Sequence, residues 1–365
     1  MKKILSALLI VGYTLPFNAQ TTVTEQIMLQ SLEEKIISFL NEEKIPGLAI
    51  AVIHHGELIH KEGYGYADLT NKIKISPDTG FNIGSISKMF TAFGVMKLIE
   101  EGVLVLDTPV SQYLTRWQLP ESKYNENKVN IRALLNHTGG ISVHGYPGFT
   151  DKEELPSLEA SLNGFNGPVR ADEKVEIVMA PQTKFNYSGG GYTILQLVIE
   201  EVTGISFEQF MEQQVFQKLK MENTSFTINK RILQNSALPY DANLKPLPFE
   251  YFTAKAAAGL QTTLNDFILF AEEIYANHKI ITDKNIQLML KPTEVSDQNY
   301  GLGFRVLHLG PIELKGHSGS NTGWQSGFFM DFNNNSGLIM MSNGDQGDIV
   351  LKKLLKHWAS IYYKL

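Results

Sequence analysis

The stretch "FNIGSISKMF", residues 81–90, decides how the chain is interpreted. It puts Ser85 three residues before Lys88, one helical turn away, where the sequence predicts the opening of a helix. A serine beside a buried lysine is a nucleophile beside its base, because desolvation lowers the lysine pKa and frees the amine. Alone the pair is weak, since roughly one such pair is expected by chance. If the Ser–Lys pair lies on a solvent-exposed helix face, it has no catalytic role.

The helix that follows Ser85 is predicted to be the central one of the fold. The segment "SKMFTAFGVMKLIEEG" ends at Gly102, a residue typical of the position after a helix. Its apolar side chains are predicted to pack on a sheet: Met89, Phe90, Phe93, Met96 and Leu98.

The strands of that sheet are predicted to come from both ends of the chain. The segment "LAIAVIHHGELIHKEGYGYAD" is typical of a β-hairpin that turns at His55–Gly56, and further strands are expected from residue 300 onward. A helix in "TEQIMLQSLEEKIISFLNEEKIPG" precedes them, with apolar residues at helical spacing: Ile27, Leu32, Ile36, Ile37 and Leu40. We therefore expect an α+β fold. Its sheet region covers about 30–80 and 300–365, and a mainly helical insertion covers about 108–255.

The N-terminus, "MKKILSALLIVGYTLPFNAQTT", has the pattern of a secretory signal peptide. Two lysines precede a short apolar run, and Ala19 offers a small residue for cleavage. The sequence thus predicts a signal over 1–19, a hydrolase domain over 20–365, a periplasmic or secreted location and no stable membrane span after cleavage. A retained N-terminal anchor is the alternative reading.

Composition excludes several classes of function. The chain has 365 residues, a net charge of −6 and an apolar fraction of 43%, so it is globular and lacks the basic face that nucleic acid needs. It contains no cysteine, which excludes disulfides and thiol catalysis. No metal-binding or phosphate-binding motif is present, so we expect no metal and no cofactor. The oligomeric state stays open.

Two later motifs raise the significance of the Ser–Lys pair. "FNYSGGGYTI" puts Tyr187 just before a glycine run and a predicted helix, and "LKGHSGSNTGW" puts His317-Ser318-Gly319 on or beside a predicted strand. With "GSISK" these motifs resemble, in order, the three signatures of the penicillin-recognising serine hydrolases. That superfamily includes class C β-lactamases, D-Ala-D-Ala carboxypeptidases, D-aminopeptidases and related esterases. Flanking segments also resemble it: "LLNHTGG" (134–140), "GISFEQFMEQQVFQKLKMENTSF" (204–226), "AAGLQTTLNDFILFA" (257–271) and "YGLGF" (300–304).

The resemblance implies a β-lactamase/transpeptidase-like fold and a role for each motif residue. Ser85 would be the acyl-accepting nucleophile, Lys88 its base, and Tyr187 the proton carrier to the leaving group. The backbone N–H groups of Ser85 and Ser320 would form the oxyanion hole. His317 would bind a substrate carboxylate or tune Tyr187, and Gly319 would leave room for substrate along the strand. On its residues alone, Tyr187 is equally a core tyrosine at a glycine turn.

Two departures from the family pattern bear on the substrate. His317 stands where β-lactamases have lysine, and Gly189 stands where the second signature usually ends in asparagine. The histidine would bind a β-lactam carboxylate less firmly, and the glycine weakens the case for recognition of a β-lactam or an acyl-D-Ala group. Both departures leave Ser85, Lys88 and Tyr187 intact. The expected substrates are esters or D-amino-acid peptides of the cell-wall type. A β-lactamase and a catalytically weak homologue that binds peptidoglycan fragments are the alternatives, and whether Asn186 replaces the missing amide is left open.

Other polar residues receive structural expectations. His137 in "LLNHTGG" is expected to bond backbone, and His54 and His55 are expected to be solvated at their turn. Asp331 and Asp345 are expected to serve backbone groups at strand ends. The loop-rich segments 141–175 and 234–254 are expected to roof a cleft.

Overall fold

The structure is a computed structural model that describes residues 23–164 and 173–364. The predicted signal peptide, residues 1–19, lies outside the described residues. Among the helices that are described, none combines the length and the apolar character needed to cross a bilayer.

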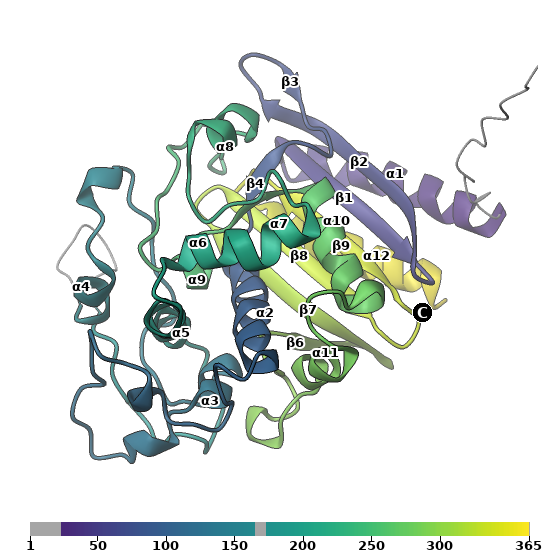
Figure 1. The fold of residues 1–365 in the computed structure, drawn as a ribbon. Coiled ribbons are helices and arrows are strands. Elements are labelled where there is room, and N and C mark those ends of the chain that lie inside the picture. The colour runs from purple at the N-terminus through teal and green to yellow at the C-terminus, as the bar shows by residue number, and fades with distance from the viewer. Residues whose placement is uncertain (1–22, 165–172, 365) are drawn as a thin grey trace, which may run out of the picture.

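A seven-stranded antiparallel sheet forms the centre of the molecule (Figure 1). Its strand order is β3-β2-β1-β9-β8-β7-β6, so strands from the two ends of the chain meet where β1 pairs with β9. The strands are β1 (Gly47–His54), β2 (Glu57–Asp68), β3 (Ile73–Lys74), β6 (Arg305–Leu309), β7 (Ile312–Asn321), β8 (Trp324–Asp331) and β9 (Ser336–Ser342). A separate two-stranded ladder joins β4 (Gly80–Asn82) to β5 (Gln261–Thr263).

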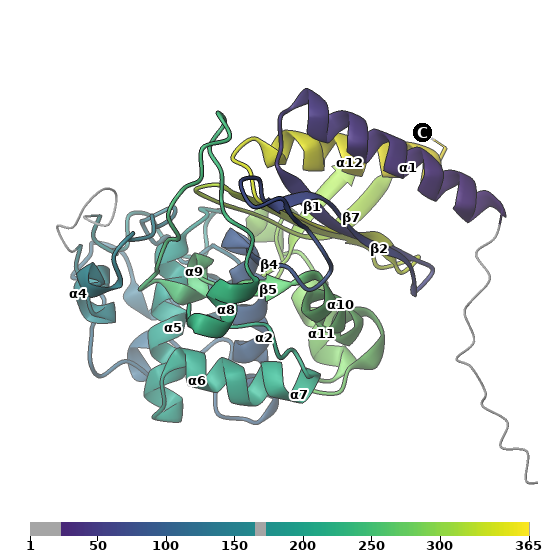
Figure 2. The ribbon, with the colours of Figure 1, turned by 90° about the horizontal axis from the view of Figure 1, so that it is seen from above.

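Two helices cover one face of the large sheet. The N-terminal helix α1 (Val23–Glu42) and the C-terminal helix α12 (Gly347–Tyr362) lie side by side on it (Figure 2). The predicted helix is therefore present in α1, but part of its predicted apolar face is wrong. Leu32, Ile36 and Leu40 are buried against the sheet as predicted, together with Met28, whereas Ile27 and Ile37 are exposed. Apolar residues on two sides of the helix fit the same period, and only the sheet decides which side is covered.

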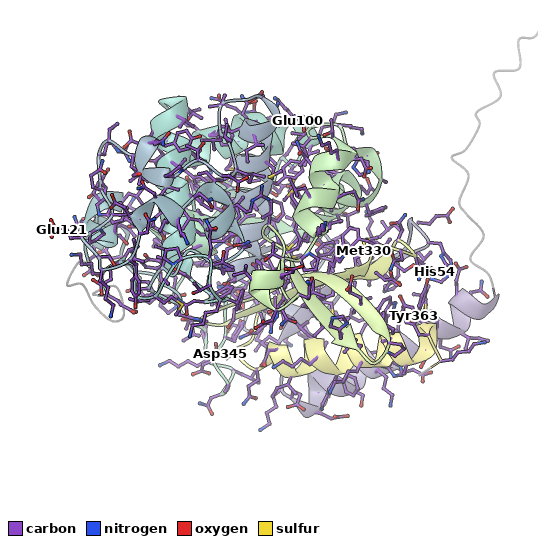
Figure 3. All side chains as sticks on the ribbon, turned by 90° about the horizontal axis from the view of Figure 1, so that it is seen from below. His54, Glu100, Glu121, Met330, Asp345 and Tyr363 are labelled. Atoms are coloured by element: carbon purple, nitrogen blue, oxygen red, sulfur yellow. The ribbon has the colours of Figure 1, made fainter. Side chains whose placement is uncertain are left out.

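The remaining helices gather on the opposite face and beside it (Figure 2). They are α2 (Ser87–Glu100), α3 (Ile131–Leu135), α4 (Leu158–Leu162), α5 (Gly189–Thr203), α6 (Phe207–Met211), α7 (Gln217–Leu219), α8 (Lys230–Asn235), α9 (Lys255–Ala258), α10 (Leu264–Glu272) and α11 (Asp283–Leu290). The apolar side chains predicted to be buried on α2 are buried, and α2 packs against α5 and α9. This packing buries almost the whole first turn of α2. Glu100 is the last residue of α2, at the opposite end of the helix (Figure 3).

The two loop-rich segments meet above this region. Phe149 and Tyr251 exchange backbone hydrogen bonds of 2.8 and 2.7 Å, which join the loop after residue 141 to the loop before α9. Further along, the Thr253 hydroxyl donates to the Pro156 carbonyl at 2.8 Å. The segments that sequence analysis assigned to a roof are thus tied to each other.

Candidate active site

Ser85 lies in a single 3₁₀ turn, Gly84–Ile86, between β4 and α2. The turn begins at Gly84, whose φ of +50° is costly for residues with a side chain. It is fixed from both sides: Asn82 Oδ1 accepts from the Gly84 N–H at 2.9 Å, and the Ser326 hydroxyl donates to the Ile83 carbonyl at 2.8 Å. Ser85 itself is half-buried, so a rigid turn presents its hydroxyl to solvent.

Lys88 lies directly behind Ser85. Its Nζ is 3.2 Å from Ser85 Oγ and donates to the Ala257 carbonyl at 2.7 Å. The side chain is only 1% exposed, and burial lowers the pKa of Lys88 to about 7. A large share of the amine is therefore neutral near neutral pH and able to accept the Ser85 proton. The solvated-face reading of the Ser–Lys pair is excluded, because one of the two residues is in the core.

Tyr187 lies across from Lys88, with the lysine Nζ 5.0 Å from the centre of its ring. It precedes α5, whose first turn is capped by the Ser188 hydroxyl accepting from the Gly191 N–H at 2.9 Å. Burial raises the pKa of the Tyr187 phenol, and its hydrogen bond with Ser85 opposes that rise. The phenol stays protonated at neutral pH. The site therefore contains one group suited to accept a proton, Lys88, and one suited to donate it, Tyr187.

Gly189 carries no side-chain amide at the end of the Tyr187 motif, and Asn186 does not supply one in its place. The Asn186 side chain donates to the Ile141 carbonyl at 2.8 Å and so serves the roof loop. A Cβ on Gly189 would lie 3.1 Å from the His144 carbonyl oxygen and 3.3 Å from Gly145 Cα. The loop packs closely against α5 here, so a longer side chain would displace it.

His317 lies on β7 and is 3% exposed. Burial, reinforced by the nearby Lys88 charge, lowers the pKa of His317 to about 3. The ring is therefore neutral at working pH and brings no positive charge to a substrate carboxylate. Of the two roles expected for it, tuning the surroundings of Tyr187 agrees with this geometry, since the two ring centres are 6.0 Å apart.

Ser320 lies on a stretch of β7 that has a free edge. β6 pairs only with Ile312–Gly316, so residues 317–321 have a strand partner on the β8 side alone. Asn321 and Trp324 flank the two-residue turn between β7 and β8 and form the hydrogen-bonded pair that such turns require. The next residue, Ser320, then points its N–H toward the free edge. This edge borders the Ser85 turn, because a Cβ on Gly84 would lie 2.6 Å from Ser320 N.

The structure gives a second reason for a glycine at position 319. We expected it to leave space for substrate along the strand. A Cβ there would also lie 1.9 Å from the Ile83 carbonyl oxygen and 2.5 Å from Ser326 Oγ. Gly319 therefore allows the Ser85 turn to pack directly on β7.

Sequence reasoning missed several residues around Tyr187. Its ring centre is 4.3 Å from that of the buried His137 and 4.9 Å from that of the exposed His144. Tyr300, 1% exposed, packs edge-on against His137 at 4.7 Å and against His317 at 5.8 Å. Its only sequence signal was its place in "YGLGF".

Arg305 was also missed. It is exposed at the start of β6, paired with Gly316 beside His317, and its charge acts on Tyr187, Tyr300 and His317 to lower their pKa values. A guanidinium at the mouth of a site recognises anions such as carboxylates. Nothing in the sequence distinguishes this arginine from any other exposed one.

The other polar candidates lie outside this site. His54 is half-buried against the Tyr362 ring, 4.9 Å away, rather than solvated, and it lies near Tyr363 at one end of the sheet (Figure 3). Asp331 and Asp345 accept from backbone N–H groups of Asn333 and Gly323, as expected. In residues 23–164 and 173–364, no three His, Asp or Glu side chains are grouped to hold a metal.

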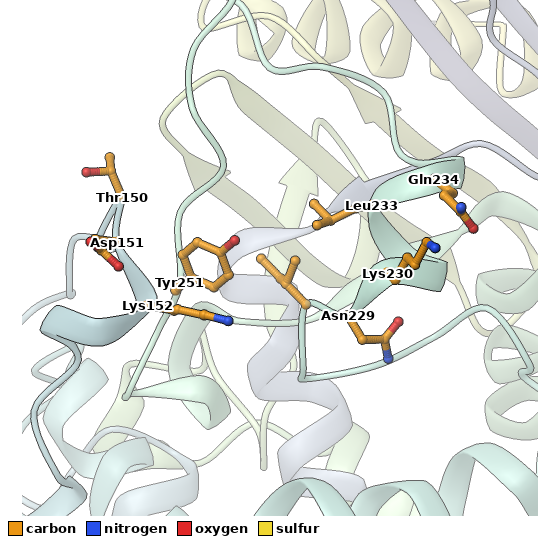
Figure 4. A pocket seen from close by; sticks show the side chains of 9 residues that line it. Thr150, Asp151, Lys152, Asn229, Lys230, Leu233, Gln234 and Tyr251 are labelled. Atoms are coloured by element: carbon orange, nitrogen blue, oxygen red, sulfur yellow. The ribbon is translucent and has the colours of Figure 1, made fainter.

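A surface pocket of about 570 Å³ lies between the roof segment and α8 (Figure 4). Lys152, Lys230, Leu233 and Tyr251 contribute to its lining, and Ser85, Lys88 and Tyr187 do not. It is therefore separate from the Ser–Lys–Tyr arrangement.

A serine hydroxyl, a buried lysine and a protonated tyrosine, set against a free strand edge, define the class of penicillin-recognising serine hydrolases. The family model described as "Beta-lactamase" matches residues 32–357, and the chain belongs to that family. The predicted superfamily and fold class are thereby confirmed. Members are generally serine hydrolases, although some lack activity.

Individual relatives agree with this assignment. The chain is 30% identical to "Protein flp" of Staphylococcus aureus (strain MRSA252) over 212 residues, 58% of this chain and 41% of that protein. It thus spans about two fifths of the length of this curated relative. Two solved structures share the fold. The penicillin-binding protein homologue from Pyrococcus abyssi has a TM-score of 0.70 at 24% identity, covering 92% of this chain and 80% of that one. The β-lactamase/D-alanine carboxypeptidase from Pseudomonas syringae has a TM-score of 0.75 at 19% identity, covering 92% and 99%.

Proposed function

We propose that the protein is a serine hydrolase that forms an acyl-enzyme on Ser85 and acts on esters or D-amino-acid peptides of the cell-wall type. The observation that carries this proposal is the 3.2 Å contact between Ser85 Oγ and a lysine amine whose burial lowers its pKa to about 7. A lysine with only a structural role would not require a serine hydroxyl within hydrogen-bond distance of its amine.

Acylation then follows from the proton states of the three residues. Ser85 Oγ bonds to the substrate carbonyl carbon as its proton passes to neutral Lys88 Nζ. The oxyanion that forms is stabilised by the N–H groups of Ser85 and Ser320. When the bond to the leaving group breaks, that group takes a proton from the Tyr187 hydroxyl, which regains one from the Lys88 ammonium.

Deacylation reverses the same path with water as the nucleophile. Water adds to the acyl ester as its proton passes through the Tyr187 hydroxyl to neutral Lys88. The proton then moves from Lys88 to Ser85 Oγ, which leaves as a hydroxyl. No other acid or base is needed, because Lys88 ends each half-reaction neutral.

Two observations weigh against β-lactams, and the first of them weighs against acyl-D-Ala peptides as well. Gly189 carries no amide, and Asn186 is bonded to the Ile141 carbonyl, so neither holds an acyl amide. The pKa of His317, lowered by burial to about 3, leaves that ring without charge for a β-lactam carboxylate. A secreted or periplasmic location is part of the proposal and is supported only by the signal-like pattern of residues 1–19.

A panel of substrates tests the proposal. The pure protein is incubated with a fluorescent penicillin, a chromogenic cephalosporin, short nitrophenyl esters and a D-Ala-D-Ala peptide, each beside Ser85→Ala. We expect turnover of an ester or of the peptide that disappears in Ser85→Ala. Rapid cephalosporin turnover would make the protein a β-lactamase instead. An absence of turnover and labelling with every compound would reject both enzyme functions and favour a protein that only binds peptidoglycan fragments.

Arg305 provides a second, finer prediction about the substrate. If the leaving group carries a free carboxylate, Arg305→Ala is expected to raise KM for the D-Ala-D-Ala peptide by about tenfold, the loss of one charged hydrogen bond. A neutral nitrophenyl ester should change little, and Arg305→Lys should keep most of the peptide activity. An equal loss on both substrates would show that Arg305 does not recognise the carboxylate.

A further inference from the structure

Among the described residues, two buried imidazole nitrogens near Tyr187 have no hydrogen-bond partner: His137 Nε2 and His317 Nε2. The Tyr300 hydroxyl interacts with the Tyr192 oxygen and has no other partner there, and each of these three side chains is no more than 3% exposed. The Tyr300 ring packs against both imidazoles, at 4.7 and 5.8 Å between centres. Buried polar groups in folded proteins are almost always paired, so the two unpaired nitrogens call for a shared partner.

The backbone contact of His137 fixes which of its nitrogens carries the proton. The Ser188 N–H donates to His137 Nδ1 at 3.1 Å, so Nδ1 is the bare nitrogen. Burial, together with the Lys88 charge, lowers the pKa of His137 well below its usual value, so the ring is neutral. Its single proton is therefore on Nε2, and the unpaired Nε2–H is a donor.

His317 has the opposite tautomer. Its Nδ1 lies 2.5 Å from the Ser318 carbonyl, an atom that can only accept, so Nδ1 carries the proton. The ring is neutral, and Nε2 is a bare acceptor. One imidazole thus offers a donor and the other an acceptor, and the Tyr300 ring packs against both.

We propose that His137, Tyr300 and His317 bind one internal water molecule, and that this water makes His137 a positioning residue for Tyr187. The water accepts from His137 Nε2–H and donates to His317 Nε2 and to the Tyr300 oxygen. The Tyr300 proton is then directed to the Tyr192 oxygen, with which it interacts, because the Tyr192 hydroxyl donates its own proton to the Leu135 carbonyl at 2.9 Å. Every polar atom of the cluster is then satisfied, and the water makes the three bonds typical of a buried water.

This water would connect the segment that carries Tyr187, just before α5, to strand β7. His137 follows α3 and grips the backbone of Ser188 at the start of α5, next to Tyr187. His317 belongs to β7, the strand that borders the Ser85 turn. A bridge between them fixes the distance from the tyrosine side of the site to the strand side. The catalytic consequence rests on the proposed function, whereas the water site and its tautomers do not.

The tautomers can be measured without any substrate. In protein labelled with ¹⁵N-histidine, long-range ¹H–¹⁵N spectra at pH 7 are expected to show His137 as the Nε2–H tautomer and His317 as the Nδ1–H tautomer. Signals are assigned from their loss in His137→Asn and His317→Asn. Tyr300→Phe should shift the Nε2 signals of both rings, while Tyr275→Phe, whose hydroxyl contacts the distant Gly56, should shift neither. The same tautomer in both rings, a protonated ring, or no response to Tyr300→Phe would overturn the water site.

Matched variants of His137 then test its role in positioning. Asparagine keeps an acceptor for the Ser188 N–H and tolerates the φ of +58° at this position, but it lacks the ε donor. Glutamine keeps the ε donor. With a fluorophosphonate as probe, His137→Asn and Tyr300→Phe should each slow labelling of Ser85 by about tenfold, the double variant should be no slower, and His137→Gln should recover most of the rate. Additive losses would reject the positioning role. If the wild type is not labelled at all, the proposed function fails, and the spectra still decide the water site.

Discussion

Replacement of Lys88 by methionine is expected to abolish acylation of Ser85 and to stabilise the folded protein at the same time. Methionine fills a similar volume but cannot take the serine proton, so labelling by a fluorophosphonate should fall by about 10³-fold or more. Stability is expected to rise because the charged form of Lys88 is buried and, among the described residues, has only the Ala257 carbonyl and the Ser85 hydroxyl as acceptors.

The stability gain should depend on pH in a defined direction. The pKa of Lys88 is about 7 in the folded protein and 10.5 when exposed, so the unfolded chain binds more protons between these values. Stability therefore rises with pH across that range, and the cost of burying charged Lys88 is complete below pH 7, on the order of 5 kcal/mol. Lys88→Met leaves the buried Ala257 carbonyl without its hydrogen bond, which offsets about 1–3 kcal/mol of this stability gain. The rise in Tm should thus be largest near pH 6 and shrink toward pH 10.

A matched control lies on the same helix. Lys97 forms an ion pair with Glu101 at 2.6 Å near the solvent end of α2, so Lys97→Met removes a lysine of the same type without touching the site. It should label at the wild-type rate and show no pH-dependent gain in Tm. Normal labelling of Lys88→Met would remove Lys88 from the mechanism, whatever happens to its stability.

The residues that sequence analysis identified are those whose function depends on order along the chain. Ser85 and Lys88 lie one helical turn apart, so spacing predicted that they could touch but not that they react. Their roles, and the choice of Tyr187 and His317, came from the resemblance of the three motifs, in order, to the serine-hydrolase superfamily. The fold class was predictable for a similar reason, since strand-like segments at both ends of the chain must share a sheet if a helical region separates them.

The features that could not be predicted from the sequence depend on packing between segments that are far apart in the chain. The proposed water site draws His137 and Tyr300 from two separate loops and His317 from β7, and none of these residues is unusual in its local pattern. The proton positions depend on single backbone contacts, such as Ser188 N–H to His137. The face of α1 that is buried was predicted in part only, because several apolar stripes on one helix satisfy the same period until the sheet selects one.

Gly319→Ala is expected to disable the site without removing any reacting group. The added methyl would lie 1.9 Å from the Ile83 carbonyl oxygen, two residues before Ser85, and 2.5 Å from Ser326 Oγ. The carbonyl belongs to the backbone and cannot rotate away, so the Ser85 turn must move off β7. Separating Ser85 from the Ser320 N–H should slow acylation by about 10²–10³-fold, the effect of losing one oxyanion donor. Overpacking should also lower stability by about 1–3 kcal/mol.

Gly327→Ala is the matched control for this change. Gly327 lies on the neighbouring strand β8, paired with Ser318, and a Cβ there would meet nothing closer than Met340 Cε at 3.6 Å. It should fold and label like the wild type. Adding Ser326→Ala to Gly319→Ala relieves the contact with the hydroxyl but leaves the contact with the Ile83 carbonyl, so the double variant should stay slow. Labelling of Ser85 at the wild-type rate in Gly319→Ala would show that the direct packing of the Ser85 turn on β7 does not hold the nucleophile in place. Recovery of the wild-type rate when Ser326→Ala is added to Gly319→Ala would show the same.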